Sequence, residues 1–129
     1  MHTLEELMST GVFAVERQTG LREAAARMVE RAVGAAVVLE GGRLIGILTE
    51  RDILRAFGSG RDEGAKVEDC MTKDPEVVEP QESADHAAAL MIHGGFRHLP
   101  VVEGDRVVGI VSIRDLMRVT LSDTSPRGA

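Results

Sequence analysis

A chain of 129 residues, 43% hydrophobic and 28% charged, has the composition of one compact globular unit and is too short for two ordinary domains. Its formal net charge of −6 argues against nucleic acid as the main partner, because proteins that bind the phosphate backbone usually carry an excess of basic residues. No apolar run is long enough to cross a bilayer, the N-terminal residues lack a signal-peptide pattern, and the single cysteine excludes an internal disulfide. We therefore expect a soluble, cytoplasmic protein.

The first half of the chain predicts three helices and three strands. They are, in order, a short helix ending near residue 8, a strand at 13–15, a helix from 21 to 29, strands at 35–39 and 44–48 around a turn at 40–43, and a helix from 50 to 57. Thr3 and Glu6 have the spacing of a capping box, in which the threonine hydroxyl would cap the first helix. The glycine-rich residues 58–64 follow and predict a linker.

The second half repeats the first. Residues 67–71 match the opening helix, 77–78 match the first strand, Ser83 is the predicted N-cap of the next helix, and 99–102 and 107–111 match the hairpin around a turn at 103–106. A repeat of this size buries little core alone, so the two copies must pack against each other. We expect repeats at 1–57 and 66–121, a linker at 58–65 and a disordered tail at 122–129.

One motif closes both repeats. The stretch from Gly46 to Asp52 reads Gly-Ile-Leu-Thr-Glu-Arg-Asp, and the stretch from Gly109 to Asp115 reads Gly-Ile-Val-Ser-Ile-Arg-Asp. Small and aliphatic residues that run into Thr or Ser are typical of a buried strand ending at a helix N-cap. Each strand-to-helix corner therefore combines a carboxylate with unpaired backbone N–H groups, which is a favourable place for a phosphate-bearing ligand.

Two interpretations of the hydroxyl and aspartate pairs remain open. Thr49 with Asp52, and Ser112 with Asp115, have the spacing of a capping box, which needs no ligand. The same carboxylate, in the first helical turn, can accept both hydroxyls of a ribose while the hydroxyl and the N–H groups face a phosphate. Capping and binding are compatible, so capping does not by itself exclude a site.

These features together resemble a tandem pair of CBS domains, the Bateman module. The resemblance covers residues 3–120 and rests on the Gly-x-x-Thr/Ser-x-x-Asp motif, found twice in register, and on Met8-Ser9, Met71-Thr72 and Leu99-Pro100-Val101-Val102. It implies an α/β (α+β) fold of two β-α-β-β-α repeats, packed face to face through their sheets with pseudo-twofold symmetry. It also implies two clefts that hold adenosine-containing ligands.

The resemblance further implies which residues bind the ligand. The aspartates would accept the ribose hydroxyls, and the Thr or Ser before them would contact the sugar–phosphate region. One site would combine Thr49, Arg51 and Asp52 with Phe96, Arg97 and His98, and the other would combine Ser112, Arg114 and Asp115 with Val33, Gly34 and Ala35. The basic residues have an alternative interpretation as solvated side chains near helix ends.

The sequence does not indicate other chemistry. His86, His93 and His98 do not share one helix face, so we expect no metal site, and no nucleophile has an adjacent base, so we expect no catalysis. Cys70 stands where the first repeat has Leu7, and we interpret it as a small buried hydrophobe.

The sequence therefore predicts a stand-alone, non-catalytic sensor that requires no cofactor. We expect it to bind AMP, ADP, ATP or another adenosine derivative and to signal to a protein target by conformational change, without a membrane partner. The wide apolar stripes of its helices predict a homodimer. The alternative is a structural or interaction protein that has the same fold, dimerises and binds no nucleotide.

Overall fold

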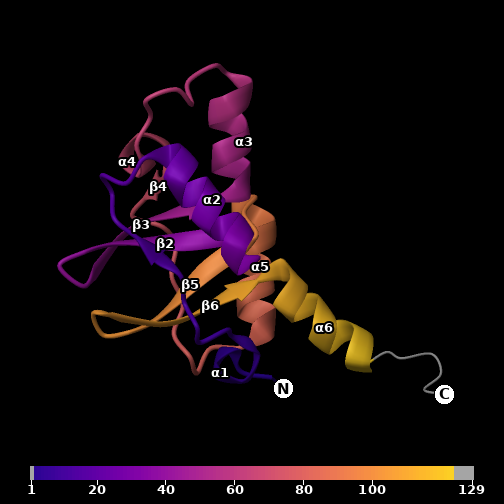
Figure 1. Ribbon diagram of the computed structural model, residues 1–129. Helices are drawn as coiled ribbons and strands as arrows, with labels where there is room; N and C mark the ends of the chain where they lie inside the picture. Colours follow the sequence, from indigo (N-terminus) through magenta and orange to yellow (C-terminus); the bar gives the residue numbers. More distant parts are fainter. Residues whose placement is uncertain (1, 124–129) are drawn as a thin grey trace. The chain divides into compact units, whose positions relative to one another are not determined.

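The computed structural model describes residues 2–123, which form two compact units (Figure 1). The contiguous unit consists of residues 12–75, and the split unit consists of residues 2–11 together with residues 76–123. Each unit combines a small sheet with helices, which confirms the predicted mixed α/β class. Among the described residues, no helix is long and apolar enough to cross a membrane.

A four-stranded sheet organises the contiguous unit. Its strands are β1 (Ala14–Val15), β2 (Ala35–Glu40), β3 (Arg43–Thr49) and β4 (Thr72–Lys73), and they lie in that order across the sheet. β1 is parallel to β2, while the other neighbours are antiparallel. Helix α2 (Leu21–Arg31) connects the parallel pair, and α3 (Glu50–Gly58) and α4 (Val67–Cys70) follow β3. The predicted order of strand, helix, strand, strand and helix is confirmed.

The core of the contiguous unit is formed by the sheet and by one face of each helix. β2 is buried from Ala35 to Val38, as expected for an unbroken apolar run. α2 buries three apolar residues at helical spacing, Leu21, Ala24 and Met28.

The split unit repeats this plan with fewer strands. It contains α1 (Leu4–Leu7), α5 (Ala84–Gly94), β5 (His98–Glu103), β6 (Arg106–Ser112) and α6 (Ile113–Asp123). β5 and β6 form the predicted antiparallel hairpin. Single bridges, Val78 to Val101 and Ser9 to Ile110, take the places of β1 and β4, so the strand predicted at 77–78 is reduced to one parallel bridge. Ser83 caps α5 as predicted.

The opening segment of each sequence repeat lies in the unit that contains the other repeat. α1 belongs to the split unit, where Leu4 is fully buried, and α4 belongs to the contiguous unit, where Val67 is fully buried. Equivalent backbone hydrogen bonds of 2.8–2.9 Å dock both helices, from Leu4 and Glu5 to the carbonyls of Glu82 and Pro80, and from Val67 and Glu68 to those of Thr19 and Arg17. The compact units therefore cut across the sequence repeats.

The glycine of each closing motif makes room for these opening segments. A Cβ atom at Gly46 would lie 2.6 Å from Met71 Sδ and 2.9 Å from the carbonyl oxygen of the residue after it. A Cβ atom at Gly109 would lie 2.5 Å from Met8 Sδ and 3.0 Å from the carbonyl oxygen that follows. Any side chain at these positions would overlap the opening segment, because methionine and backbone already fill the space.

The capping box predicted at Thr3 and Glu6 is wrong. Thr3 precedes α1, but its side chain makes no capping hydrogen bond. The N–H of Glu6 donates instead to the backbone carbonyl of Thr3 at 3.2 Å, and the two N–H groups before it donate to the loop at 80–82. The first N–H groups of the helix are therefore satisfied without the hydroxyl.

Two helices end later than the sequence predicted. α3 ends at Gly58, and α6 continues to Asp123, so residues 122 and 123 are helical rather than part of a tail. The rest of the predicted tail, 124–129, lies outside the described residues.

Candidate functional site

The first candidate corner lies in the contiguous unit, where β3 ends and α3 begins. Thr49 is the N-cap of α3; its backbone N–H and its hydroxyl donate to Asp52 Oδ2 at 2.9 and 3.0 Å. The N–H of Asp52 donates back to the Thr49 hydroxyl at 3.3 Å. The predicted capping box is therefore present, and it uses only one of the two carboxylate oxygens.

The second corner lies in the split unit, where β6 ends and α6 begins, and has the same geometry. The N–H and hydroxyl of Ser112 donate to Asp115 Oδ2 at 2.8 and 3.0 Å, and the N–H of Asp115 donates to the Ser112 hydroxyl at 3.2 Å. Asp52 and Asp115 are each 7% exposed and are the buried polar residues of the described chain. A buried carboxylate requires hydrogen-bond donors, and the corner supplies them on one oxygen.

An arginine three residues later in the helix forms an ion pair with the second oxygen of each aspartate. Arg55 Nη1 lies 3.6 Å from Asp52 Oδ1, and Arg118 Nη1 lies 3.0 Å from Asp115 Oδ1. Both guanidinium groups are exposed, so these ion pairs are weak and can give way to another partner. The sequence interpretation missed both arginines, although their position three residues after a helical aspartate was an available signal.

Within the contiguous unit, predicted site residues from the end of α2 lie beside the first corner. Ala35 is the ladder partner of Thr49, and the N–H of Glu50 donates to the Gly34 carbonyl at 3.0 Å. Val33 is partly buried and packs against the core. Arg51 is exposed in the first turn of α3.

Within the split unit, Arg97 and His98 lie beside the second corner in the same way. His98 is the ladder partner of Ser112, and the N–H of Ile113 donates to the Arg97 carbonyl at 2.9 Å. Arg97 is exposed, His98 is partly buried, and Phe96 is partly buried against the core. Arg114 is exposed in the first turn of α6. Each corner thus lies next to the junction residues of its own unit, whereas the predicted pairing of Asp52 with Arg97 and His98 joins different units and stays a prediction.

Between residues 2 and 123, no group of three or more His, Cys, Asp or Glu side chains is arranged to hold a metal ion. His86 Nε2 lies 2.9 Å from Glu82 Oε1, and His93 Nδ1 lies 3.0 Å from the Ala89 carbonyl oxygen. Both histidines therefore interact with residues four positions earlier in the chain.

Cys70 is partly buried and packs against the core of the contiguous unit. Burial raises the pKa of its thiol, the carboxylates of Asp69 and Asp52 raise it further, and Arg61 opposes them. The uncharged thiol is therefore favoured, which makes Cys70 a poor nucleophile near neutral pH.

The chain belongs to the CBS domain family. That family matches residues 4–59 and residues 67–122, once in each sequence repeat. The chain is 40% identical over 120 residues to a 17.7 kDa protein of Acidianus ambivalens, covering 92% of this chain and 73% of that protein. It is 36% identical over 130 residues to the CBS domain-containing protein YhcV of Bacillus subtilis, covering 100% of this chain and 93% of YhcV.

Solved structures of other CBS proteins have the same fold. A CBS-domain protein of Burkholderia ambifaria matches with a TM-score of 0.90 and 31% identity, covering 96% of this chain and 97% of that one. The CBS domain pair of protein MJ0100, in complex with 5′-methylthioadenosine and S-adenosyl-L-methionine, matches with a TM-score of 0.90 and 25% identity over 96% and 99% of the two chains. CBSX2 in complex with AMP matches with a TM-score of 0.82 and 26% identity over 95% and 98%.

Proposed function

We propose that this CBS pair is a non-catalytic regulatory module that binds adenosine-containing nucleotides at the Asp52 and Asp115 corners. The ligand favours one arrangement of the repeats, and a protein target recognises that arrangement, because a ligand shifts a conformational equilibrium only through a difference in affinity for its states. AMP, ADP, ATP and related adenosine derivatives are the candidate ligands.

The proposal rests on one observation: the two carboxylate oxygens of each aspartate have different partners. The capping box holds Oδ2 and so fixes the plane of the carboxylate, while Oδ1 faces an exposed arginine. A ribose presents two neighbouring hydroxyl donors, and a fixed carboxylate can accept from them. Capping a helix needs only one oxygen, so the same side chain is able to serve the fold and a ligand together.

The ligands of the structural neighbours are consistent with this division. 5′-Methylthioadenosine, S-adenosyl-L-methionine and AMP are bound by CBS pairs that share 25–26% identity with this chain. The adenosine, with its ribose hydroxyls, is the part that these three ligands have in common, whereas a phosphate is present only in AMP. We therefore assign the aspartates to the shared ribose, and Arg51, Arg97 and His98 to the phosphate of ligands that carry one.

A thermal-shift panel tests this function. A ligand at 100 times its dissociation constant is expected to stabilise the protein by about 2.7 kcal/mol, and AMP, ADP, ATP, NAD and S-adenosyl-L-methionine form the panel. The double variant Asp52→Asn, Asp115→Asn keeps an oxygen for the cap and is expected to lose the shift. Asp105→Asn, on the exposed turn of the second hairpin, is the matched control. No shift with any ligand at millimolar concentration would contradict the proposal.

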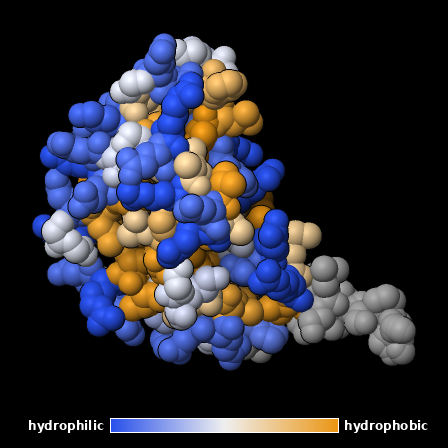
Figure 2. Space-filling model, viewed as in Figure 1, coloured by the Kyte–Doolittle hydropathy of each residue, from blue (hydrophilic) through white to orange (hydrophobic). Residues whose placement is uncertain are grey.

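A structural or interaction protein is the second candidate, and one observation favours it. Apolar side chains are exposed at equivalent positions of the two repeats, Val29 (81%) with Ile92 (74%) on α2 and α5, and Leu54 (70%) with Met117 (54%) on α3 and α6. Figure 2 shows hydrophobic residues reaching the surface among hydrophilic ones. Such faces are typical of association, and a dimer without nucleotide affinity would show mass doubling and no thermal shift.

A further inference from the structure

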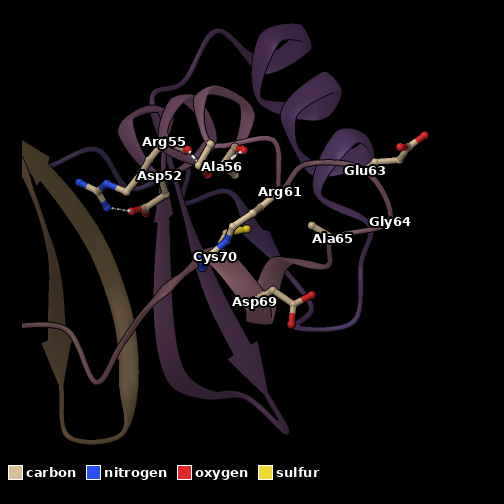
Figure 3. A pocket seen from close by; sticks show the side chains of 10 residues that line it. Asp52, Arg55, Ala56, Arg61, Glu63, Gly64, Ala65, Asp69 and Cys70 are labelled. Carbon is tan, nitrogen blue, oxygen red and sulfur yellow. Dashed lines mark hydrogen bonds and ion pairs between the residues drawn. The ribbon is translucent and has the colours of Figure 1, made fainter.

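A pocket of the contiguous unit extends from Asp52 along α3 and past the end of that helix. Its volume is about 720 Å³, which is in the range of small-molecule sites, and all of its lining residues fall between Asp52 and Cys70 (Figure 3). α3 supplies Asp52 and Arg55, the segment after it supplies Ser59 and Arg61, and α4 supplies Asp69 and Cys70. The proposed ribose contact at Asp52 uses only one end of this space.

The turn after α3 fixes the position of Arg61. Gly60 has a φ of +72°, its N–H donates to the Phe57 carbonyl at 3.1 Å, and the N–H of Arg61 donates to the Ala56 carbonyl at 2.8 Å. This pair of bonds is a Schellman motif, which turns the chain back toward the helix that it leaves. One residue further on, Asp62 Oδ2 lies 2.7 Å from Nη2 of Arg22 in α2. The segment predicted as a linker is therefore an ordered wall of the pocket.

Charges of both signs line this pocket. Figure 3 shows the Arg61 side chain extending toward Cys70, with Asp69 on the neighbouring helix. Arg55 is paired with Asp52, whereas the ion pairs found among residues 2–123 do not include Arg61. Asp69 Oδ2 accepts the N–H of Lys66 at 2.9 Å, which leaves Oδ1 for another donor. Beyond the pairs already made, the pocket thus offers the guanidinium of Arg61 and carboxylate oxygens of Glu63 and Asp69.

We infer that this pocket binds the zwitterionic amino-acid group of a small molecule, with Arg61 holding its carboxylate and Asp69 its ammonium. A guanidinium matches a carboxylate through two parallel N–H donors, and a carboxylate accepts from an ammonium. A purely anionic ligand fits less well, because Asp52, Glu63 and Asp69 also line the space, and a purely cationic one would lie against Arg61. The inference rests on the proposed function where the amino-acid group is attached to an adenosine, because the ribose would then be at Asp52.

Calorimetric titration of the full chain with three probes tests the inference. S-Adenosyl-L-homocysteine carries adenosine and the amino-acid group, 5′-methylthioadenosine carries adenosine without it, and L-methionine carries the amino-acid group alone. We expect the first to bind at least about tenfold more tightly than the second, as one charge-assisted pair would give. Arg61→Gln is expected to reduce that advantage to less than about twofold without weakening 5′-methylthioadenosine.

The variant keeps the fold intact, because Arg61 uses only its backbone N–H in the turn. Arg43→Gln, at the exposed start of β3, is the matched control and is expected to bind like the unchanged chain. The single cysteine gives a second readout, since Cys70 lines the pocket. S-Adenosyl-L-homocysteine is expected to slow the alkylation of Cys70 by iodoacetamide more than 5′-methylthioadenosine does, and this difference is expected to disappear in Arg61→Gln.

The outcomes separate this inference from the proposed function. Equal affinities for S-adenosyl-L-homocysteine and 5′-methylthioadenosine would overturn the inference and leave adenosine binding in place. Binding of L-methionine alone, with protection of Cys70 that Arg61→Gln abolishes, would support the pocket as a site for a free amino acid. If none of the three probes binds, the inference is wrong, and parallel titrations with AMP and ATP decide the proposed function independently.

Discussion

Asp52 and Asp115 have the same capping geometry, so any difference in ligand binding between them must come from the residues around the cap. The resemblance assigns the cationic pair Arg97 and His98 to the ligand on Asp52, whereas within the split unit this pair lies beside Ser112. We predict that Asp52→Ala weakens the binding of AMP or ATP more than Asp115→Ala does, measured by calorimetry. Equal losses would make the assignment of Arg97 and His98 wrong. Unchanged binding with lower melting temperatures for both variants would favour capping alone.

Arg97 and His98 are predicted to recognise phosphate rather than adenosine. Replacing them by Gly and Ala, the residues at the matching positions 34 and 35, removes two charge-assisted contacts of roughly 1.5–3 kcal/mol each. The affinity for AMP or ATP is expected to fall by about tenfold to a few hundredfold, and the affinity for adenosine is expected to change little. Equal losses for all three would show that the pair only shapes the pocket.

The thiol of Cys70 gives a prediction about pH. Burial, followed by the nearby carboxylates, raises its pKa in the folded protein above that of the unfolded chain. Alkylation by iodoacetamide requires the thiolate, so its rate in the native protein is expected to rise at higher pH than in urea-unfolded protein. The folded state holds this proton more tightly, so the contribution to stability is complete below the unfolded pKa and is lost as pH rises through the folded pKa. Coinciding rate profiles would contradict the burial of this thiol.

The residue that caps the C-terminus differs between the equivalent helices α2 and α5, and this difference predicts an effect on stability. Ala32 follows α2 in the left-handed conformation, with φ 55° and ψ 44°, where the second repeat has Gly95 after α5 with φ 73°. Alanine in this conformation costs roughly 1–2 kcal/mol, which exceeds the entropic cost of glycine, roughly 0.5–1 kcal/mol. Ala32→Gly is expected to raise the free energy of unfolding by up to about 1 kcal/mol, measured from the urea midpoint. Gly95→Ala is the matched reverse change and is expected to lower it.

Local elements were predictable because their signals are local. The hairpin at Gly41 and Gly42 has positive φ at both residues, and the Ser83 cap needs only its own helix. The Thr3 cap failed because backbone carbonyls satisfy the N–H groups that the hydroxyl would cap: the N–H of Glu5 donates to Pro80, more than seventy residues away, and the N–H of Glu6 donates to Thr3. The exchange of α1 and α4 between units could not be predicted either, because an amphipathic pattern does not specify which repeat buries the apolar face of the helix.

In the candidate site, too, the local part was predictable from the sequence and the non-local part was not. The capping geometry at Thr49 and Ser112 followed from the sequence, because all its atoms lie within four residues. The role proposed for Arg61 did not, because the glycine-rich composition after α3 indicates a loop without specifying the turn that Gly60 makes. The pairing between residues of the two units depends on tertiary geometry, which a sequence pattern does not determine.

For the whole molecule, the exposed apolar positions predict a homodimer. Light scattering at micromolar concentration is expected to give twice the mass of one chain. Leu54→Glu with Met117→Glu is expected to give the mass of one chain, because both side chains are exposed and the change adds charge to the apolar surface of α3 and of α6 without disturbing either core. Arg106→Glu, on the exposed hairpin, is the control. A single-chain mass for the unchanged protein would exclude the dimer.

Because the opening segments are exchanged, the two units can complete their folding at different times during synthesis. The contiguous unit requires nothing after residue 75 and can fold while later residues are still being added. The split unit cannot close until Ile110 has left the ribosome to pair with Ser9, an interval of roughly 5–20 s at 5–20 residues per second. The split unit's core contains Leu4 and is packed by Leu7 and Met8. During this interval these three apolar side chains have no core to pack against. A nascent chain that has exposed residues 1–90 outside the ribosome should therefore carry one folded unit and an uncovered apolar N-terminal segment.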